Sequence, residues 1–137
     1  MLLVPQWSPL SIIETMNDIQ DIEIIGIPQA LLYHRYGVLW KEFFERMGFE
    51  VLVSPQTDAD IYSAGDAASV DESCIALKTY MGHVEWLIDR CDAIFAPSFQ
   101  SGNVRAGFCT RYQSLPDIVR NEFRDRNVAV LSMLVED

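Results

Sequence analysis

Four short apolar runs alternate along the chain with longer segments in which apolar residues recur every three or four positions. The runs are IEIIGI at 22–27, FEVLV at 49–53, AIFA at 93–96 and VAVLSMLV at 128–135. Continuous apolar runs of this length are typical of strands that are buried on both faces of a parallel sheet. The pattern therefore predicts four strands that are separated by helices.

A helical pattern is clearest between Gln29 and Met47. The apolar positions that recur there at steps of three and four residues are Leu32, Tyr36, Leu39, Trp40, Phe43, Phe44 and Met47. Gly48 follows directly, and helices often end at a residue that accepts a left-handed backbone. We therefore expect one long helix between the first two strands.

Capping residues indicate two shorter helices. Thr57 or Asp58 is expected to start one that runs towards Ala68, because short polar side chains accept hydrogen bonds from the free amides of a helix start. The sequence SLPDIV at 114–119 places a serine, a proline and an acid where they favour the start of another helix. Residues 98–107 are polar and contain glycine, which predicts a loop.

The segment Asp71–Arg90 is expected to form the central helix of the domain. Its apolar stripe consists of Leu77, Tyr80, Met81, Val84, Leu87 and Ile88. Acidic and hydroxyl side chains precede Cys74, which places this thiol in the first turn, where the positive end of a helix lowers the pKa of a thiol. Lys78, one turn later, would act in the same direction. A single cysteine near a helix start is nevertheless more often a small buried apolar residue.

The alternation of strands and helices with short connections predicts a flavodoxin-like or Rossmann-like α/β domain of three layers, with a parallel sheet of about four strands. Ligands of such sheets bind at the carboxyl ends of the strands. Cys74 and Cys109 each follow a strand and a loop and precede a helix, so we expect both at this edge. Cys91 lies between a helix and a strand, which predicts a structural role at the opposite edge.

Length and charge narrow the classes of function. A chain of 137 residues suits a single domain, which we place at 21–137 after a leader segment at 1–20. The formal net charge of −10 would repel nucleic acid and anionic membrane surfaces, so neither is expected as a partner. Three widely spaced cysteines do not form a disulfide framework, which favours a reducing, cytoplasmic location. The apolar opening lacks a basic start and contains prolines, so we expect neither a signal peptide nor an anchor.

Other kinds of site fit the sequence less well. A structural zinc site would need paired ligands such as a CxxC motif, and dinucleotide binding would need a GxGxxG turn where the chain has GIPQAL. A hydrolase with Cys74 as its nucleophile would need His34 or His83 as the base, whereas we expect His83 to bond a backbone carbonyl. Three tyrosines could donate a hydrogen bond to a substrate at the same edge, although aromatic residues at helical spacing are usually core residues: Tyr62, Tyr80 and Tyr112.

Three segments resemble the 2-hydroxyacyl-CoA dehydratase family (2-hydroxyglutaryl-CoA dehydratase D-component), and in particular the dehydratase-like region of CoA-substrate-specific enzyme activases. They are GIPQALLYHRYGVLWKEFFERMGFEVLVSP, DESCIALKTYMGHVEWLIDRCDAIFAPS and FCTRYQSLPDIVRNEF. The resemblance depends on a helix that starts at GIP, a cysteine followed by lysine and Gly-His, and a cysteine ahead of a Leu-Pro helix. Two positions depart from the family pattern: Gln29 replaces an arginine, and Met81 replaces a histidine.

The resemblance implies a domain like one half of a dehydratase-type subunit, a 4Fe-4S cluster bound by cysteines, and a separate ATP-dependent activator that donates the electron. Cys74 and Cys109 match the cluster ligands of the family, with Lys78 and His83 as supporting residues. Family chains continue into a second domain that supplies a further cysteine, and a four-iron cluster needs three or four protein ligands. The chain is therefore a fragment, or a homo-oligomer or second dehydratase-like subunit completes the cluster, or the cluster is absent.

Two functional hypotheses follow. In the first, the chain is an iron–sulfur redox domain or subunit that supports electron transfer to an acyl-CoA, and Cys74 and Cys109 hold the cluster. In the second, it is a clusterless assembly or regulatory module of the same fold, with no catalysis of its own, in which the two cysteines are packing residues.

Overall fold

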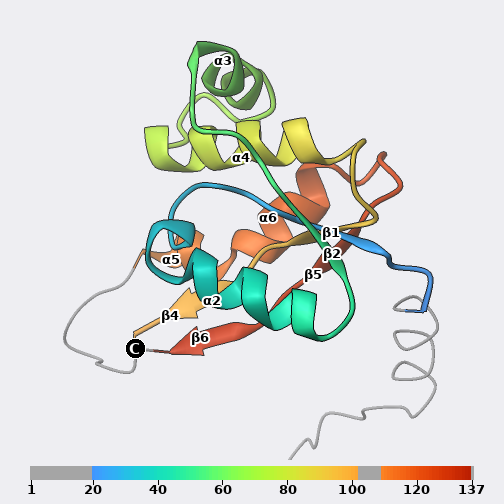
Figure 1. Ribbon diagram of the computed structural model, residues 1–137. Helices are drawn as coiled ribbons and strands as arrows, with labels where there is room; N and C mark the ends of the chain where they lie inside the picture. Colours follow the sequence, from blue (N-terminus) through green and yellow to red (C-terminus); the bar gives the residue numbers. More distant parts are fainter. Residues whose placement is uncertain (1–19, 102–108, 137) are drawn as a thin grey trace, which may run out of the picture.

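Four parallel strands form the central sheet of the computed structural model, which describes residues 20–101 and 109–136. They are β1 (Ile24–Ile27), β2 (Glu50–Val53), β3 (Ala93–Phe95) and β5 (Ala129–Leu131), in the order β2-β1-β3-β5 (Figure 1). This is the order of the first four strands of flavodoxin-like sheets. The expected α/β class and the parallel sheet of four strands are confirmed.

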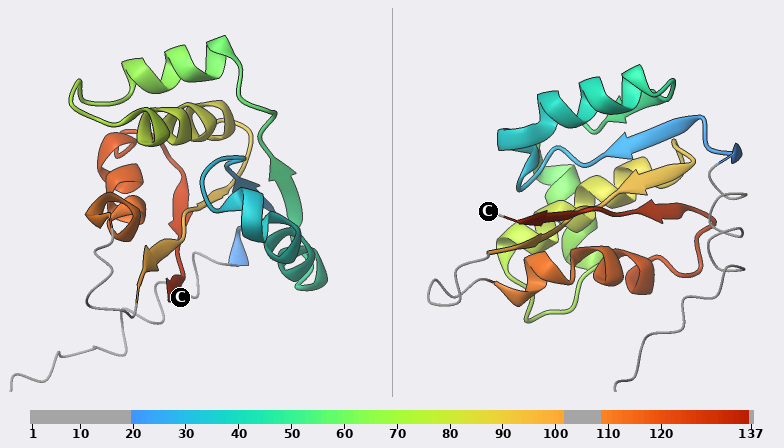
Figure 2. Two further views of the ribbon diagram at one scale, coloured as in Figure 1. Left: turned by 90° about the vertical axis from the view of Figure 1, so that its left-hand side faces the viewer. Right: turned by 90° about the horizontal axis from the view of Figure 1, so that it is seen from below.

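Helices cover both faces of the sheet, which gives three layers (Figure 2). On one face, α2 (Tyr33–Arg46) packs against the sheet and contributes Trp40 and Phe44 to a cluster with alternate residues of β1 and β3. The ring of Phe95 lies 5.1 Å from that of Trp40 and 5.0 Å from that of Phe44, in edge-to-face geometry that adds to the burial of the rings. The end of α2 is as expected, with Gly48 at φ 96°.

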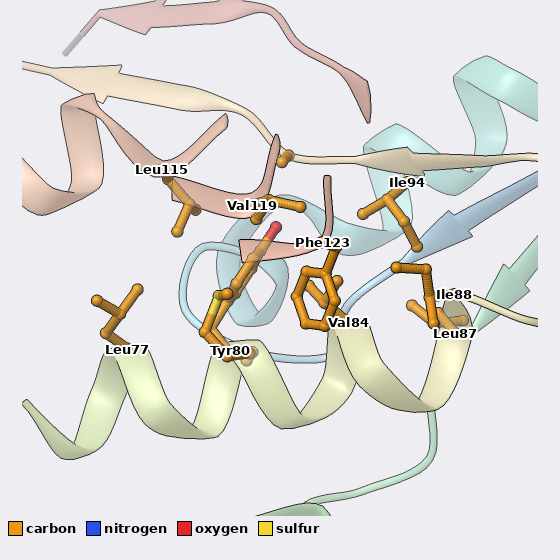
Figure 3. Close-up of a cluster of buried hydrophobic side chains, with 12 residues drawn as sticks. Leu77, Tyr80, Val84, Leu87, Ile88, Ile94, Leu115, Val119 and Phe123 are labelled. Atoms are coloured by element: carbon orange, nitrogen blue, oxygen red, sulfur yellow. The ribbon is translucent and has the colours of Figure 1, made fainter. Parts of the chain in front are cut away.

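On the other face, α4 (Ile75–Leu87) and α6 (Leu115–Glu122) pack against the sheet. Figure 3 shows their side chains meeting in one cluster, in which Leu77, Val84 and Val119 are at least nine-tenths buried. The predicted helix over Asp71–Arg90 corresponds to α4, which begins four residues later and ends three residues earlier than predicted. Its apolar stripe is buried as predicted.

A further helix, α3 (Ala59–Ala67), lies on the outer side of α4 (Figure 2). Asp58 caps it as expected, because its carboxylate accepts a hydrogen bond from the Ile61 amide at 2.9 Å. Two glycines let α3 and α4 approach closely. A β-carbon added at Gly65 would lie 1.8 Å from the Lys78 carbonyl oxygen, and one added at Gly82 would lie 1.9 Å from that of Ile61.

Two expectations for the chain after β3 need correction. Residues 98–100 are not a loop: Ser98–Gln100 forms β4, which pairs in parallel with β6 (Leu134–Glu136). The apolar run at 128–135 is not one strand, because it divides into β5 and β6 around residues 132–133. Strands of three residues with polar members lack the continuous apolar pattern on which the prediction depended.

A short helix, α5 (Thr110–Gln113), comes directly before α6. Ser114 precedes α6 as expected, but its side chain does not cap the helix by accepting a hydrogen bond from an amide of α6. Its hydroxyl instead donates to the Thr110 carbonyl at 2.9 Å. Almost all of the leader predicted at 1–20, and most of the loop predicted at 98–107, lie outside the described residues. Among the described residues, no helix has the length and apolar character needed to cross a membrane.

Candidate functional site

The carboxyl edge of the sheet contains the point at which strand order reverses. β1 leads through α2 to β2 on one side, while β3 lies on its other side, so the loops after β1 and β3 separate there. A narrow apolar cavity lies at this point, and its walls include Pro28, Leu31, Tyr80, Pro97 and Tyr112. Ligands of doubly wound sheets bind at such reversal points.

Cys74 and Cys109 line one pocket that adjoins this cavity. The pocket has a volume of about 20 Å³ and shares Leu31, Tyr112 and Leu115 with the cavity. Both cysteines are free and exposed. Cys74 is the residue before α4 and its thiol makes no capping hydrogen bond, while Cys109 is the residue before α5. The structure therefore brings together the two thiols that the sequence singled out.

Two contacts hold the cysteine-bearing segments side by side. Leu77, one turn into α4, and Leu115, at the start of α6, belong to the same buried cluster (Figure 3). Across the pocket, the Arg111 guanidinium donates a hydrogen bond to the Glu72 carbonyl at 3.4 Å. These contacts lie within a few residues of each cysteine, so the core of the fold determines where the thiols lie.

Leu31 forms a wall of both the cavity and the cysteine pocket. Its φ of 53° is left-handed, a conformation that costs a non-glycine residue free energy and that recurs at functional sites. Sequence reasoning did not identify Leu31, because nothing in the residue type signals such a backbone. Arg111 was also missed, because its only signal in the sequence is that it is a basic residue two positions after Cys109.

Tyr112 lies beside both thiols. Burial raises the pKa of its phenol, and the negative charges that Cys109 and Cys74 can carry raise it further. The phenol therefore remains protonated at neutral pH. Tyr80 has a different role, because it is buried and its hydroxyl donates to the Phe95 carbonyl at 3.4 Å.

His83 is fully buried away from the thiols. Its Nδ1 lies 2.8 Å from the Ser54 hydroxyl and its Nε2 lies 2.9 Å from the Thr57 hydroxyl. Ser54 also accepts a hydrogen bond from the Gln29 amide at 2.7 Å. The expected backbone carbonyl partner is therefore wrong, since two hydroxyls take its place. Because both ring nitrogens are engaged there, His83 is not placed to act as a base for Cys74.

Lys78 forms an ion pair with Asp66 and does not take the position near Cys74 that was expected. Its ammonium lies 2.6 Å from a carboxylate oxygen of Asp66 in α3, and this hydrogen bond raises the pKa of the lysine. A lysine that is paired in this way joins α4 to α3. The expectation that it folds back towards Cys74 is therefore not what the structure shows.

Cys91 lies at the opposite edge of the sheet, before the start of β3, as the sequence predicted. Its thiol donates to the Leu87 carbonyl at 3.3 Å, and burial raises its pKa to about 11. A β-carbon at Gly26 would lie 2.7 Å from its sulfur, so the glycine makes room for this side chain. These contacts indicate a structural residue.

The contrast between the cysteines gives a direct prediction. At pH 8, iodoacetamide should modify Cys91 at least about 10-fold more slowly than Cys74 or Cys109, because alkylation requires the thiolate and access to it. Peptide mass spectrometry over a time course measures the three rates in one sample. Equal rates would contradict the structural role of Cys91.

No group of three or more histidine, cysteine, aspartate or glutamate side chains is placed to hold a metal ion in residues 20–101 and 109–136. Cys74 and Cys109, which line one pocket, are two donors and fall short of such a group.

The CoA enzyme activase uncharacterised domain matches residues 24–136 of the chain. No curated protein and no solved structure matches. The family match covers all of the described strands and helices from β1 onward and relates the chain to CoA enzyme activases. Since the match spans most of the chain, the protein belongs to the family of the CoA enzyme activase uncharacterised domain.

Proposed function

We propose that this domain supplies two thiolate ligands, Cys74 and Cys109, to an iron–sulfur cluster that a second chain or domain completes. The observation that carries the proposal is the shared pocket beside the reversal point of the sheet, which Cys74 and Cys109 both line; both cysteines are also exposed. Thiolates are the usual protein ligands of such clusters. The resemblance to 2-hydroxyacyl-CoA dehydratases and the match to an activase-related family support the same assignment.

The residues present fit part of a 4Fe-4S site. Such a cluster takes four protein ligands, or three with one open position, and two are brought together within the described residues. A pocket of about 20 Å³, which is room for about one water molecule, does not enclose four iron atoms. The proposal therefore takes the remaining ligands from elsewhere: a second copy of this chain, a dehydratase-like subunit or a further domain.

The surroundings of the thiols suit an anionic sulfur centre. Cys74 lies at the start of a helix of 13 residues, whose amino end stabilises negative charge. The protonated phenol of Tyr112 is a hydrogen-bond donor beside both sulfurs, and such donors around a cluster tune its potential. When bound, the cluster would supply one-electron transfer, with an ATP-dependent activator as electron donor and an acyl-CoA as acceptor.

The second hypothesis, a clusterless assembly or regulatory module, is less well supported. It treats both cysteines as packing residues, yet both are exposed in the structure. Cysteines that only fill space in the core are among the most buried residues of proteins. Cys91, which is partly buried and whose thiol donates to a backbone carbonyl, comes nearer to that description than Cys74 or Cys109 does.

Anaerobic reconstitution tests the proposal. The full chain would be incubated with ferrous iron, sulfide and dithiothreitol, whose thiols substitute for the missing ligands. We expect visible charge-transfer absorption, with about four iron atoms per chain if dithiothreitol completes the site and about two if two copies share one cluster.

Single variants identify the ligands in this experiment. Cys74→Ala and Cys109→Ala should each lose most of the bound iron, whereas Cys91→Ala, the matched cysteine at the other edge, should retain it. Circular dichroism would show that all three variants fold. A colourless wild-type chain, or iron that survives loss of both Cys74 and Cys109, would rule the proposal out.

A further inference from the structure

We infer that Cys74 and Cys109 also form a thiol modification site, at which the two sulfurs join in a reversible intramolecular disulfide. The inference uses the same two side chains as the proposed cluster site but does not depend on iron. Loss of one proposal therefore leaves the other standing.

The first observation is that the two side chains border one small pocket. Cys74 and Cys109 both line it, and its volume is about 20 Å³, which is room for about one water molecule. Both are free, exposed and without a capping hydrogen bond, so either side chain can turn towards the other without breaking an interaction of that kind.

The second observation is that side-chain contacts connect the segments that carry the two cysteines. The hydrogen bond from Arg111 to the Glu72 carbonyl links positions two residues from each cysteine. Leu77 and Leu115 both line the pocket and belong to the same buried cluster (Figure 3). A disulfide tolerates only a narrow range of backbone separations, and these contacts limit the separation here.

The third observation is that Cys91, the remaining thiol of the chain, is poorly placed to form a disulfide with Cys74 or Cys109. Cys91 lies at the other edge of the sheet, its sulfur donates to the Leu87 carbonyl, and burial raises its pKa to about 11. A thiol that is held protonated is a poor nucleophile in disulfide exchange. Oxidation should therefore select the pair Cys74 and Cys109.

The chemistry requires an oxidant such as glutathione disulfide. One protein thiolate attacks a sulfur of glutathione disulfide, which breaks that bond, forms a mixed disulfide and releases one glutathione thiolate. The second protein thiolate then attacks the protein sulfur of the mixed disulfide and releases the second glutathione. In sum, two protein thiols lose two electrons and two protons, and glutathione disulfide is reduced to two glutathione molecules.

The oxidised pair has no thiolate, and thiolates are the form that binds iron. A chain with the disulfide should therefore take up no iron at this site until it is reduced. This consequence, unlike the disulfide itself, rests on the proposed cluster site: there the pair would couple the binding of iron to the redox state of the surroundings.

Titration of the reduced full chain with glutathione disulfide tests the inference. We expect the mass to fall by that of two hydrogen atoms, and digestion without reductant to give one linked product that contains Cys74 and Cys109. Closing a loop of this length should raise the melting temperature by roughly 5 to 15 °C, an effect that dithiothreitol reverses.

Three variants complete the experiment. Cys91→Ala should form the same linkage, while Cys74→Ser and Cys109→Ser should each retain one glutathione as a mixed disulfide. A wild-type chain that gains one or two glutathione molecules without linking the two peptides would overturn the inference. So would a chain whose mass does not change.

Discussion

Replacing Gly82 with alanine should lower the free energy of unfolding by about 3 kcal/mol or more, a large effect for a single methyl group. The added carbon would lie 1.9 Å from the carbonyl oxygen of Ile61, far inside van der Waals contact. Because that oxygen belongs to the backbone of α3, the clash can be relieved only by moving the helices apart. Gly65→Ala should act in the same way, since its carbon would lie 1.8 Å from the Lys78 carbonyl oxygen.

Gly37→Ala is the matched control for this prediction. It makes the same change inside a helix at a buried glycine, but the nearest atoms belong to the side chain of Tyr33, at 2.5 Å, and a side chain can turn aside. The better helix propensity of alanine offsets part of that cost, so we expect a change within about 1 kcal/mol. Urea unfolding followed by circular dichroism measures all three variants. A Gly82→Ala chain as stable as the wild type would show that α3 does not pack on α4 as described.

The second large effect is a dependence of stability on pH that comes from one side chain. Burial lowers the pKa of His83 from its ordinary value of 6.5, with a smaller contribution from His34. As the pH falls below about 6.5, the unfolded chain takes up a proton at His83 while the folded chain does not, so the unfolded state is favoured. The contribution of His83 to the free energy of unfolding should therefore fall by up to about 1.4 kcal/mol per pH unit until the folded-state pKa is reached.

Comparison of variants isolates this contribution from that of the carboxylates. His83→Gln should flatten the dependence of stability on pH between pH 7.5 and 5.5. At pH 7.5 it should also lower the free energy of unfolding by about 1 to 3 kcal/mol, because the hydrogen bonds to the hydroxyls of Ser54 and Thr57 are lost or weakened. His34→Gln, a change at an exposed position of α2, is the matched control and should alter the dependence much less than His83→Gln does, because His34 makes only the smaller contribution to the lowered pKa of His83. Urea titrations at several pH values give the slopes. Equal slopes for the two variants would mean that His83 is not held neutral by its burial.

The main elements of the fold could be predicted because their pattern is local. Apolar runs and apolar stripes report directly which positions are buried, and β1, α2 and the stripe of α4 follow from them. The strand β4 could not be found in this way, because the pairing of Ser98–Gln100 with β6 depends on the rest of the sheet. The close approach at Gly65 and Gly82 is likewise a property of two helices together and not of either sequence alone.

The site could be predicted to a similar extent. That Cys74 and Cys109 lie at one edge follows from the order of strands and helices, which the sequence already indicates. The partner of Lys78 could not be foreseen, because it depends on where α3 places Asp66. The hydroxyl partners of His83 come from the segment after β2, and the left-handed backbone of Leu31 has no signature in its residue type.

Dibromobimane, a short reagent with two thiol-reactive ends that fluoresces strongly only when both have reacted, provides the most direct measurement of the shared pocket. In a Cys91→Ala chain, one bridging molecule should join the peptides of Cys74 and Cys109 and fluorescence should appear, because both cysteines line the same small pocket. Separate additions at the two cysteines, with no bridged peptide, would show that the thiols do not meet, and the proposed site would be lost.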